Sequence, residues 1–215
     1  MAINFVAAGA AEADSISFAA HQENDIILIM AYRNTTTNIS FPAGWDELSI
    51  NLTTVSRRSV IATKRAASSS ETSGTWTNAS HLMYYIARPT DTHLIVGNVK
   101  SSSTNNSTTQ NNPNLNCRKS SRAVRMVAFD PSSATGYAEQ TDFTSRQASV
   151  FSDAACHVSD SDSMVASVAL YTNTMSEAIR CHSWIFEILE TSFDLAGGGG
   201  GGVAFPVIGG GGLVY

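Results

Sequence analysis

Two Cys-His dipeptides carry the residue types that could support nucleophilic or metal chemistry. They are Cys156-His157 and Cys181-His182. Neighbouring side chains on a strand point to opposite faces, so neither cysteine can hydrogen-bond to its adjacent histidine within one strand. A zinc site that uses both pairs is the alternative, because Cys and His are zinc ligands. We expect no metal and no cofactor, and we interpret both cysteines, like Cys117, as free thiols of a reducing compartment.

A run of acidic and hydroxyl residues could offer oxygen ligands to calcium. It comprises Asp153 and the segment Ser159-Asp160-Ser161-Asp162-Ser163. The run lacks the glycine turn and the distal glutamate of an EF-hand loop. We therefore expect a solvated turn that leads into a strand at Met164.

The charge pattern argues against a nucleic-acid partner. The net charge is −5, and the one basic cluster has no interleaved aromatic residues. Phosphate binding needs clustered lysine and arginine, so we interpret this cluster as a solvated strand edge. Its members are Arg118, Lys119, Arg122 and Arg125.

Catalytic motifs, membrane spans and leader signals are missing from the sequence. It contains no Gly-x-Ser-x-Gly, no His-Glu-x-x-His and no glycine-rich phosphate loop after a strand pattern, so we expect no enzymatic activity. No apolar run approaches the roughly 20 residues of a membrane span. No basic residue precedes the apolar stretch near the start, so we expect no signal peptide and assembly in a cytoplasm.

Small polar residues dominate the composition. Ser, Thr and Asn number 29, 20 and 14, which together make 63 of the 215 residues, while charged residues are only 14%. A surface solvated by hydroxyls and amides is typical of extracellular-type β proteins. The low share of charged residues and the apolar content of 43% together exclude a charge-driven disordered chain.

Short apolar segments bounded by polar turns recur along the chain and predict strands. They are Asp25–Arg33, Arg58–Ala66, Leu82–Ala87, Leu94–Val99, Ala123–Phe129, Met164–Tyr171 and Ile179–Leu189. Nine or ten strands without helical alternation indicate an all-β, antiparallel two-sheet β-sandwich with a jelly-roll-like order. Its expected core includes Ile27, Ile29, Tyr85, Val96, Val127 and Val168. By contrast, the polar segment Ser101–Asn116 is predicted to be a long loop, because it has little apolar surface to bury.

Composition changes abruptly after Ala196, so we expect a sandwich domain over 1–196 and a glycine-rich arm over 197–215. Ten of the 15 glycines lie in this arm, and they bracket two apolar plugs. Leaving such plugs in water is unfavourable, so we expect the arm to dock on another chain rather than to act as a passive linker. The expected contact residues are Gly197, Gly202, Val203, Phe205, Pro206, Val207, Ile208, Gly209, Leu213, Val214 and Tyr215.

One succession of motifs resembles a known family. It runs from His21-Gln22-(x)2-Asp25, through Pro42-Ala43-Gly44-Trp45 and Ser56-Arg57-Arg58, to the segment Ala67–Ala79 with its Ser73-Gly74-Thr75-Trp76 core. This pattern is similar to a β-sandwich module of tailed-bacteriophage virion proteins, over roughly residues 3 to 100, and Trp184 to Glu190 resembles the module's closing strand.

The resemblance implies a structural, non-enzymatic role in a virion tail, fibre or head decoration. The expected partners are other virion proteins and further copies of the chain, in a trimer or a higher homo-oligomer. The alternative is a module that binds carbohydrate or a host receptor, in which Trp45 and Trp76 stack on the ligand. The opposing interpretation of Trp45 and Trp76 is that both indoles pack in the core.

Overall fold

The computed structural model describes residues 3–54, 56–90, 93–130 and 134–191. Its regular elements are strands, and no helix occurs in these ranges. Accordingly, none of the described elements is a helix long and apolar enough to cross a membrane. The strands are β1 (Asn4–Ala11), β2 (Ile26–Arg33), β3 (Asp46–Thr54), β4 (Arg57–Arg65), β5 (His81–Arg88), β6 (His93–Asn112), β7 (Leu115–Asp130), β8 (Thr144–Val150), β9 (Ala155–Asp160), β10 (Val165–Val168) and β11 (Tyr171–Thr191).

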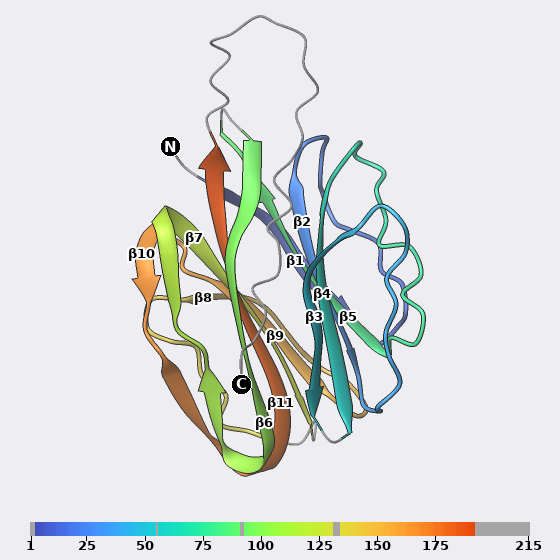
Figure 1. Ribbon diagram of the computed structural model, residues 1–215, viewed down its shortest axis with the longest axis vertical. Helices are drawn as coiled ribbons and strands as arrows, with labels where there is room; N and C mark the ends of the chain where they lie inside the picture. Colours follow the sequence, from blue (N-terminus) through green and yellow to red (C-terminus); the bar gives the residue numbers. More distant parts are fainter. Residues whose placement is uncertain (1–2, 55, 91–92, 131–133, 192–215) are drawn as a thin grey trace, which may run out of the picture.

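Two antiparallel sheets pack face to face, which confirms the predicted β-sandwich (Figure 1). The first sheet has the order β1-β5-β2-β4-β3, and the second has the order β6-β11-β7-β9-β8 with β10 paired to β7. The chain thus completes one sheet before it starts the other. A jelly roll passes the chain between its sheets several times, so the jelly-roll detail of the prediction does not describe this strand order.

Strand β2 lies in the middle of the first sheet, as its apolar run predicts. Leu28 and Met30 face the second sheet, whereas Ile27 and Ile29 face the opposite side, and all four are fully buried. A strand that is buried on both faces reads as a continuous apolar run, and this is the pattern from Ile26 onwards. Of the other expected core residues, Tyr85, Val127 and Val168 are buried and Val96 is half-buried.

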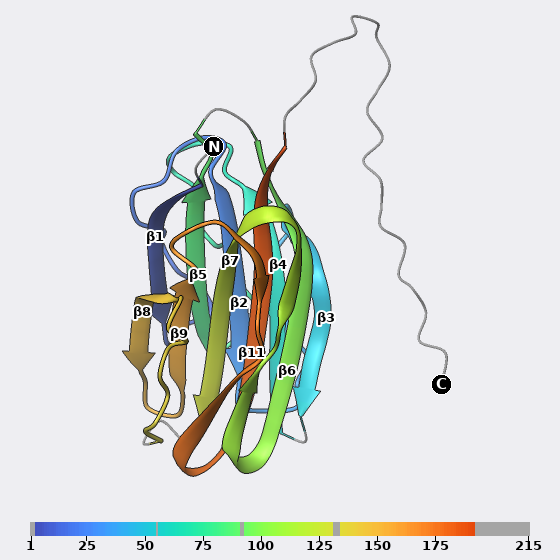
Figure 2. The ribbon, with the colours of Figure 1, turned by 90° about the vertical axis from the view of Figure 1, so that its left-hand side faces the viewer.

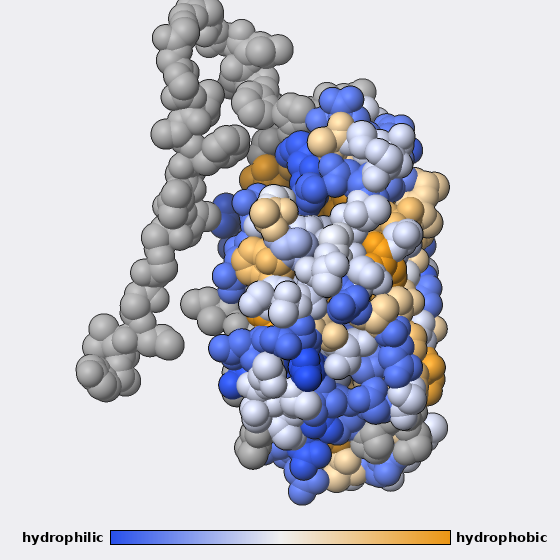
Figure 3. Space-filling view, turned by 90° about the vertical axis from the view of Figure 1, so that its right-hand side faces the viewer, coloured by the Kyte–Doolittle hydropathy of each residue, from blue (hydrophilic) through white to orange (hydrophobic). Residues whose placement is uncertain are grey.

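Apolar residues fill three layers rather than one. The largest lies between the sheets and includes Met83, Val124 and Trp184. A second layer lies on the outer face of the first sheet, beneath the loops of residues 12–25, 34–45 and 66–80. The outer surface of this side is mostly polar, with small apolar patches between the polar residues (Figure 3). Further apolar clusters cover part of the outer face of the second sheet, so the central strands of both sheets are buried on both sides.

Strands β6 and β11 form a long ribbon that bends back on itself at one end of the sandwich (Figure 2). The prediction of a loop over Ser101–Asn116 is therefore wrong, because β6 extends to Asn112 and β7 begins at Leu115. The polar side chains do not prevent strand formation, since the backbone groups pair with β11. The predicted strand Met164–Tyr171 is likewise divided, with β10 ending at Val168 and β11 beginning at Tyr171.

Candidate functional site

The loops over the first sheet are held together by the two predicted ligand-stacking residues. Trp45 and Trp76 are 6% and 0% exposed, and each indole Nε1 donates to the Ser73 carbonyl oxygen at 3.1 Å. Their rings meet edge to face at a centroid distance of 5.4 Å. Stacking on a sugar needs an open indole face, and neither ring offers one here. This placement corrects the stacking interpretation, because both residues belong to the core beneath the loops.

The other residues that carry the virion-module resemblance join the same set of loops. Glu71 donates its backbone N–H to His21 Nε2 at 3.0 Å, and Gln22 donates its N–H to Asp25 at 2.9 Å. Asp25 is fully buried and accepts hydrogen bonds from Arg88 Nε and Nη2, each at 2.8 Å. Motifs that are separated along the chain thus form one hydrogen-bonded unit over the first sheet. We call this unit, residues 12–25, 34–45 and 66–80, the loop cap.

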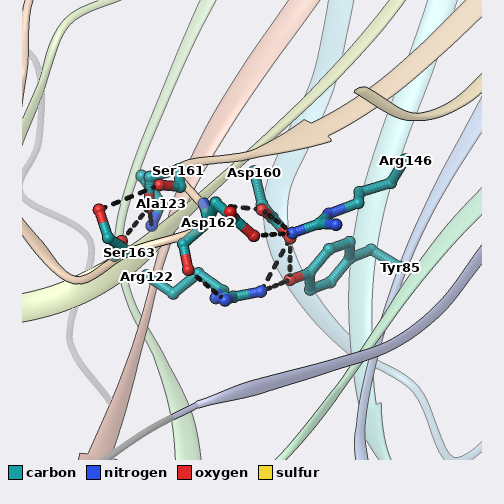
Figure 4. Close-up of polar contacts among 8 residues, drawn as sticks. All are labelled: Tyr85, Arg122, Ala123, Arg146, Asp160, Ser161, Asp162 and Ser163. Carbon is teal, nitrogen blue, oxygen red and sulfur yellow. Dashed lines mark hydrogen bonds and ion pairs between the residues drawn. The ribbon is translucent and has the colours of Figure 1, made fainter. Parts of the chain in front are cut away.

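Between the sheets, the acidic run expected to be a solvated turn contributes a buried charge. Asp160, at the end of β9, is fully buried and accepts from Tyr85 Oη at 2.6 Å and Arg122 Nη1 at 3.0 Å. Arg146 donates Nε at 3.0 Å and Nη2 at 2.9 Å, and the Asp162 N–H donates at 2.8 Å (Figure 4). These five donors occupy the carboxylate, so it is not free to bind calcium.

The basic cluster is also placed differently from the prediction. Arg122 and Arg125 are 7% and 0% exposed, so they do not form a solvated strand edge. Arg122 is neutralised by Asp160, whereas the Arg125 guanidinium lies 4.3 Å from the centroid of the Phe143 ring and donates to Gln140. Buried guanidinium groups need such partners, and the sequence pattern alone does not reveal them.

The two Cys-His dipeptides do not assemble into one site. Cys156 packs in the core between the sheets, while Cys181 packs on the outer face of the second sheet. Burial raises the pKa of both thiols, which disfavours the thiolate that zinc needs. The structure records both cysteines, and the half-buried Cys117, as free thiols.

An apolar groove opens where the edge strand β3 of the first sheet meets the edge strand β6 of the second. It has a volume of about 280 Å³ and is lined by Ile26, Asp46, Leu48, Thr63, Arg65, Leu94, Ile95 and Val96. Ile95 is one of the exposed large apolar residues of the described chain, at 36%. Sequence reasoning missed this groove, because its two walls are nearly 50 positions apart and each shows only ordinary strand alternation.

One cation borders the groove without a carboxylate partner among the described residues. Arg65 Nη2 donates to the Leu94 carbonyl oxygen at 2.7 Å and so links the two sheets. Burial lowers the pKa of Arg65, and no acidic group compensates. The groove therefore combines apolar walls with the half-buried positive charge of Arg65 and the exposed carboxylate of Asp46.

The predicted arm, residues 197–215, lies outside the described residues, together with all of its expected contact residues. The described chain ends at Thr191, which pairs with His93, two positions before Ile95. The last described residue therefore lies beside the groove.

Comparisons of the chain with protein-family models, with curated proteins and with solved structures find no match.

Proposed function

We propose that this chain is a non-enzymatic structural component of a bacteriophage particle, exposed on the virion as a tail, fibre or head-decoration subunit. The observation that supports it best is the loop cap. Every motif of the virion-module resemblance between His21 and Trp76 contributes to the loop cap or to the strands beneath it. The hydrogen bonds of these motifs join one part of the loop cap to another. Motifs that are far apart in the sequence thus form one folded unit. A resemblance to a structural module predicts such a unit.

Inter-subunit contacts are the second part of the proposal. The groove between β3 and β6 receives the apolar plug Val203–Ile208 from the glycine-rich arm of a neighbouring copy. Glycine lets the two backbones approach closely, and an extended segment adds main-chain hydrogen bonds at a strand edge. At about 3.3–3.6 Å per residue, an arm of 19 residues reaches roughly 65 Å, far enough to cross to a neighbour.

Removal of the arm tests the assembly. The full chain should form a defined homo-oligomer in size-exclusion chromatography with light scattering, and deletion of residues 197–215 should leave a monomer. The melting temperature of the truncated chain should be nearly unchanged, because the described sandwich ends at Thr191. Equal oligomerisation of both chains would mean that the arm is a passive linker.

A charge in the groove tests the docking position. Ile95→Asp should reproduce the effect of the arm deletion on oligomeric state. Leu170→Asp is the matched control, because Leu170 is exposed at 62% and does not line the groove. A monomeric full-length chain, or an Ile95→Asp variant that still assembles, would contradict docking of a neighbour's arm.

Mass spectrometry of purified particles tests whether the chain is part of a virion. Density-purified virus particles from a culture that carries this sequence should contain its peptides at many copies per particle. Detection only in the non-particle fraction would contradict the proposed function.

A further inference from the structure

Three chemically active side chains from distant parts of the chain meet at one edge of the sandwich. Glu12 follows β1, His81 begins β5, and Asp153 lies in the turn between β8 and β9. One ligand atom from each lies within 4.8 Å of the others, and this is the one such group of metal-ligating residues in the described ranges. Two of these residues belong to the first sheet and its loops, and the third to the second sheet.

His81 is the buried member of this group. It is 0% exposed and packs against the rings of Tyr32 and Phe151 at centroid distances of 6.1 and 5.3 Å. Its Nε2 lies 2.9 Å from Asp153 Oδ1, and neither ring nitrogen has a hydrogen bond of regular geometry within the described part of the chain. A buried polar atom without a hydrogen bond is unfavourable, so this imidazole is suited to a further ligand at its carboxylate-facing edge.

The two carboxylates lie on the solvent side of the imidazole. Glu12 is exposed and accepts hydrogen bonds from the N–H and the Oγ of Ser152. The Asp153 side chain is 50% exposed and accepts from Asn34 Nδ2 at 2.7 Å. Both side chains can therefore adjust by rotation, and a cation could enter from solvent past them.

Neither carboxylate is paired with an arginine or a lysine in the described structure. By contrast, the buried residues Asp25, Asp130 and Asp160 each contact at least one arginine. Two carboxylates beside one imidazole, without a cationic side chain, form a donor set for a metal ion.

We propose that Glu12, His81 and Asp153 bind one divalent transition-metal cation, with zinc as the best-fitting ion. Zinc takes nitrogen and carboxylate-oxygen ligands at about 2.0–2.2 Å, usually four in a tetrahedron. Ligand atoms of such a site lie about 3.4 Å apart, which the two exposed carboxylates reach by small rotations. The imidazole favours a transition metal over calcium or magnesium, which prefer oxygen ligands alone.

A metal at this position would join the two sheets. Its ligands are 69 and 72 positions apart along the chain, so the unfolded chain would not hold them together. Binding to the folded state alone raises stability in proportion to the logarithm of the metal concentration. The ion would thus clamp β1 and β5 to the turn between β8 and β9.

Isothermal titration of the full-length, tag-free chain with zinc chloride tests the site. We expect saturable binding of one zinc per chain and a melting temperature that rises with zinc concentration. Glu12→Gln and Asp153→Asn should each weaken the affinity at least 10-fold and abolish the shift in melting temperature. Both residues are exposed, so these variants should fold. Glu23→Gln is the matched control, because Glu23 is also exposed but lies outside the cluster, and its affinity should equal that of the original chain.

Three results would overturn the proposal. One is the absence of saturable zinc binding below millimolar concentration. Another is equal affinity in Glu12→Gln, Asp153→Asn and the control, which would place the zinc elsewhere, for example at Cys117. The third is calcium or magnesium binding as tight as that of zinc, which would exclude the imidazole as a ligand. Cobalt substitution should in addition give a visible absorption spectrum that His81→Gln removes.

Discussion

At the scale of single residues, the described fold surrounds a buried carboxylate with several hydrogen-bond donors. Asp160 accepts five hydrogen bonds, two of its partners are arginines, and Arg146 also lies over the Phe5 ring at 4.5 Å. A buried ion pair adds little net stability, because desolvation offsets the attraction, but loss of one partner leaves the other charge uncompensated. The network therefore acts mainly to specify how β9 packs against β5 and β7.

Removal of the central carboxylate should be strongly destabilising. Asp160→Asn should lower the free energy of unfolding by about 3–5 kcal/mol, because the buried Arg122 loses its counter-charge and Arg146 loses one of its two carboxylate partners. Asp162→Asn is the control: its side chain is 65% exposed, and an exposed ion pair contributes about 1 kcal/mol or less. Urea unfolding measures both. A similar small loss for the two variants would show that Arg122 and Arg146 reach other partners.

Buried histidine predicts how stability depends on pH. Burial, together with Arg57 and Arg58, lowers the pKa of His182 to about 3, whereas an unfolded histidine titrates at about 6.5. Between these values the unfolded chain binds a proton that the folded chain does not, so stability is complete above the unfolded pKa and falls as pH decreases. The slope from this group is up to about 1.4 kcal/mol per pH unit.

Replacement of the ring should remove that slope. In His182→Gln, the free energy of unfolding should change less between pH 6 and pH 4 than in the original chain. Between pH 7.5 and pH 8.5 the two slopes should agree, because the ring is neutral in both states there. Identical acid slopes would mean that His182 is accessible to protons in the folded chain.

At the scale of elements, the bent β6–β11 ribbon is held by buried amides. Gln110 and Asn112 are fully buried, and Gln110 Nε2 donates to Asn112 Oδ1 at 2.7 Å. Asn173 Nδ2 donates to Gln110 Oε1 at 3.0 Å, and Ser183 Oγ donates to Asn112 Oδ1 at 2.7 Å. The returning end of the ribbon thus packs against its own other half through polar contacts, and Asn106, with a φ of 51°, lies at the bend.

Loss of one amide should weaken the bend. Asn112→Ala should destabilise the protein by about 1–3 kcal/mol, because Gln110 and Ser183 lose a partner in a buried position. Hydrogen exchange should increase first over residues 107–112 and 171–175. Asn105→Ala is the control at an exposed position of the same strand and should stay within about 0.5 kcal/mol. Equal effects of the two substitutions would mean that backbone pairing alone holds the bend.

At the scale of the whole molecule, the sandwich has apolar layers outside its sheets as well as between them. The loop cap buries Ile27 and Ile29 as completely as the second sheet buries Leu28 and Met30. The loops of residues 12–25, 34–45 and 66–80 are therefore part of the hydrophobic core. A strand that is apolar on both faces, such as β2, needs this additional cover.

Shortening a buried side chain on either face of β2 should then lower the free energy of unfolding by about the same amount. Ile29→Ala beneath the loop cap and Leu28→Ala between the sheets should each lower the free energy of unfolding by about 2–5 kcal/mol. Chemical denaturation measures both. A loss below about 1 kcal/mol for Ile29→Ala, with a large loss for Leu28→Ala, would show that the loops only loosely cover the sheet.

Local pattern was sufficient for the strand class and for the position of the central strand. The run from Ile26 to Met30 has period-2 geometry and apolar residues on both faces, so it predicts a strand that is covered on two sides wherever it lies in the fold. The same local reasoning identified the strand from Ile179 to Leu189, because aromatic and β-branched residues favour a pleated backbone.

The tertiary structure decided the features whose partners lie far apart along the chain. Gln110 and Asn112 read as loop residues, since their partners Asn173 and Ser183 lie 63 and 71 positions away. Asp160 reads as solvated for the same reason, because its arginines come from other strands. Whether a polar side chain is exposed, buried in a network or grouped with other potential metal ligands depends on which distant groups reach it. Strand pairing determines this, and local periodicity carries no information about it.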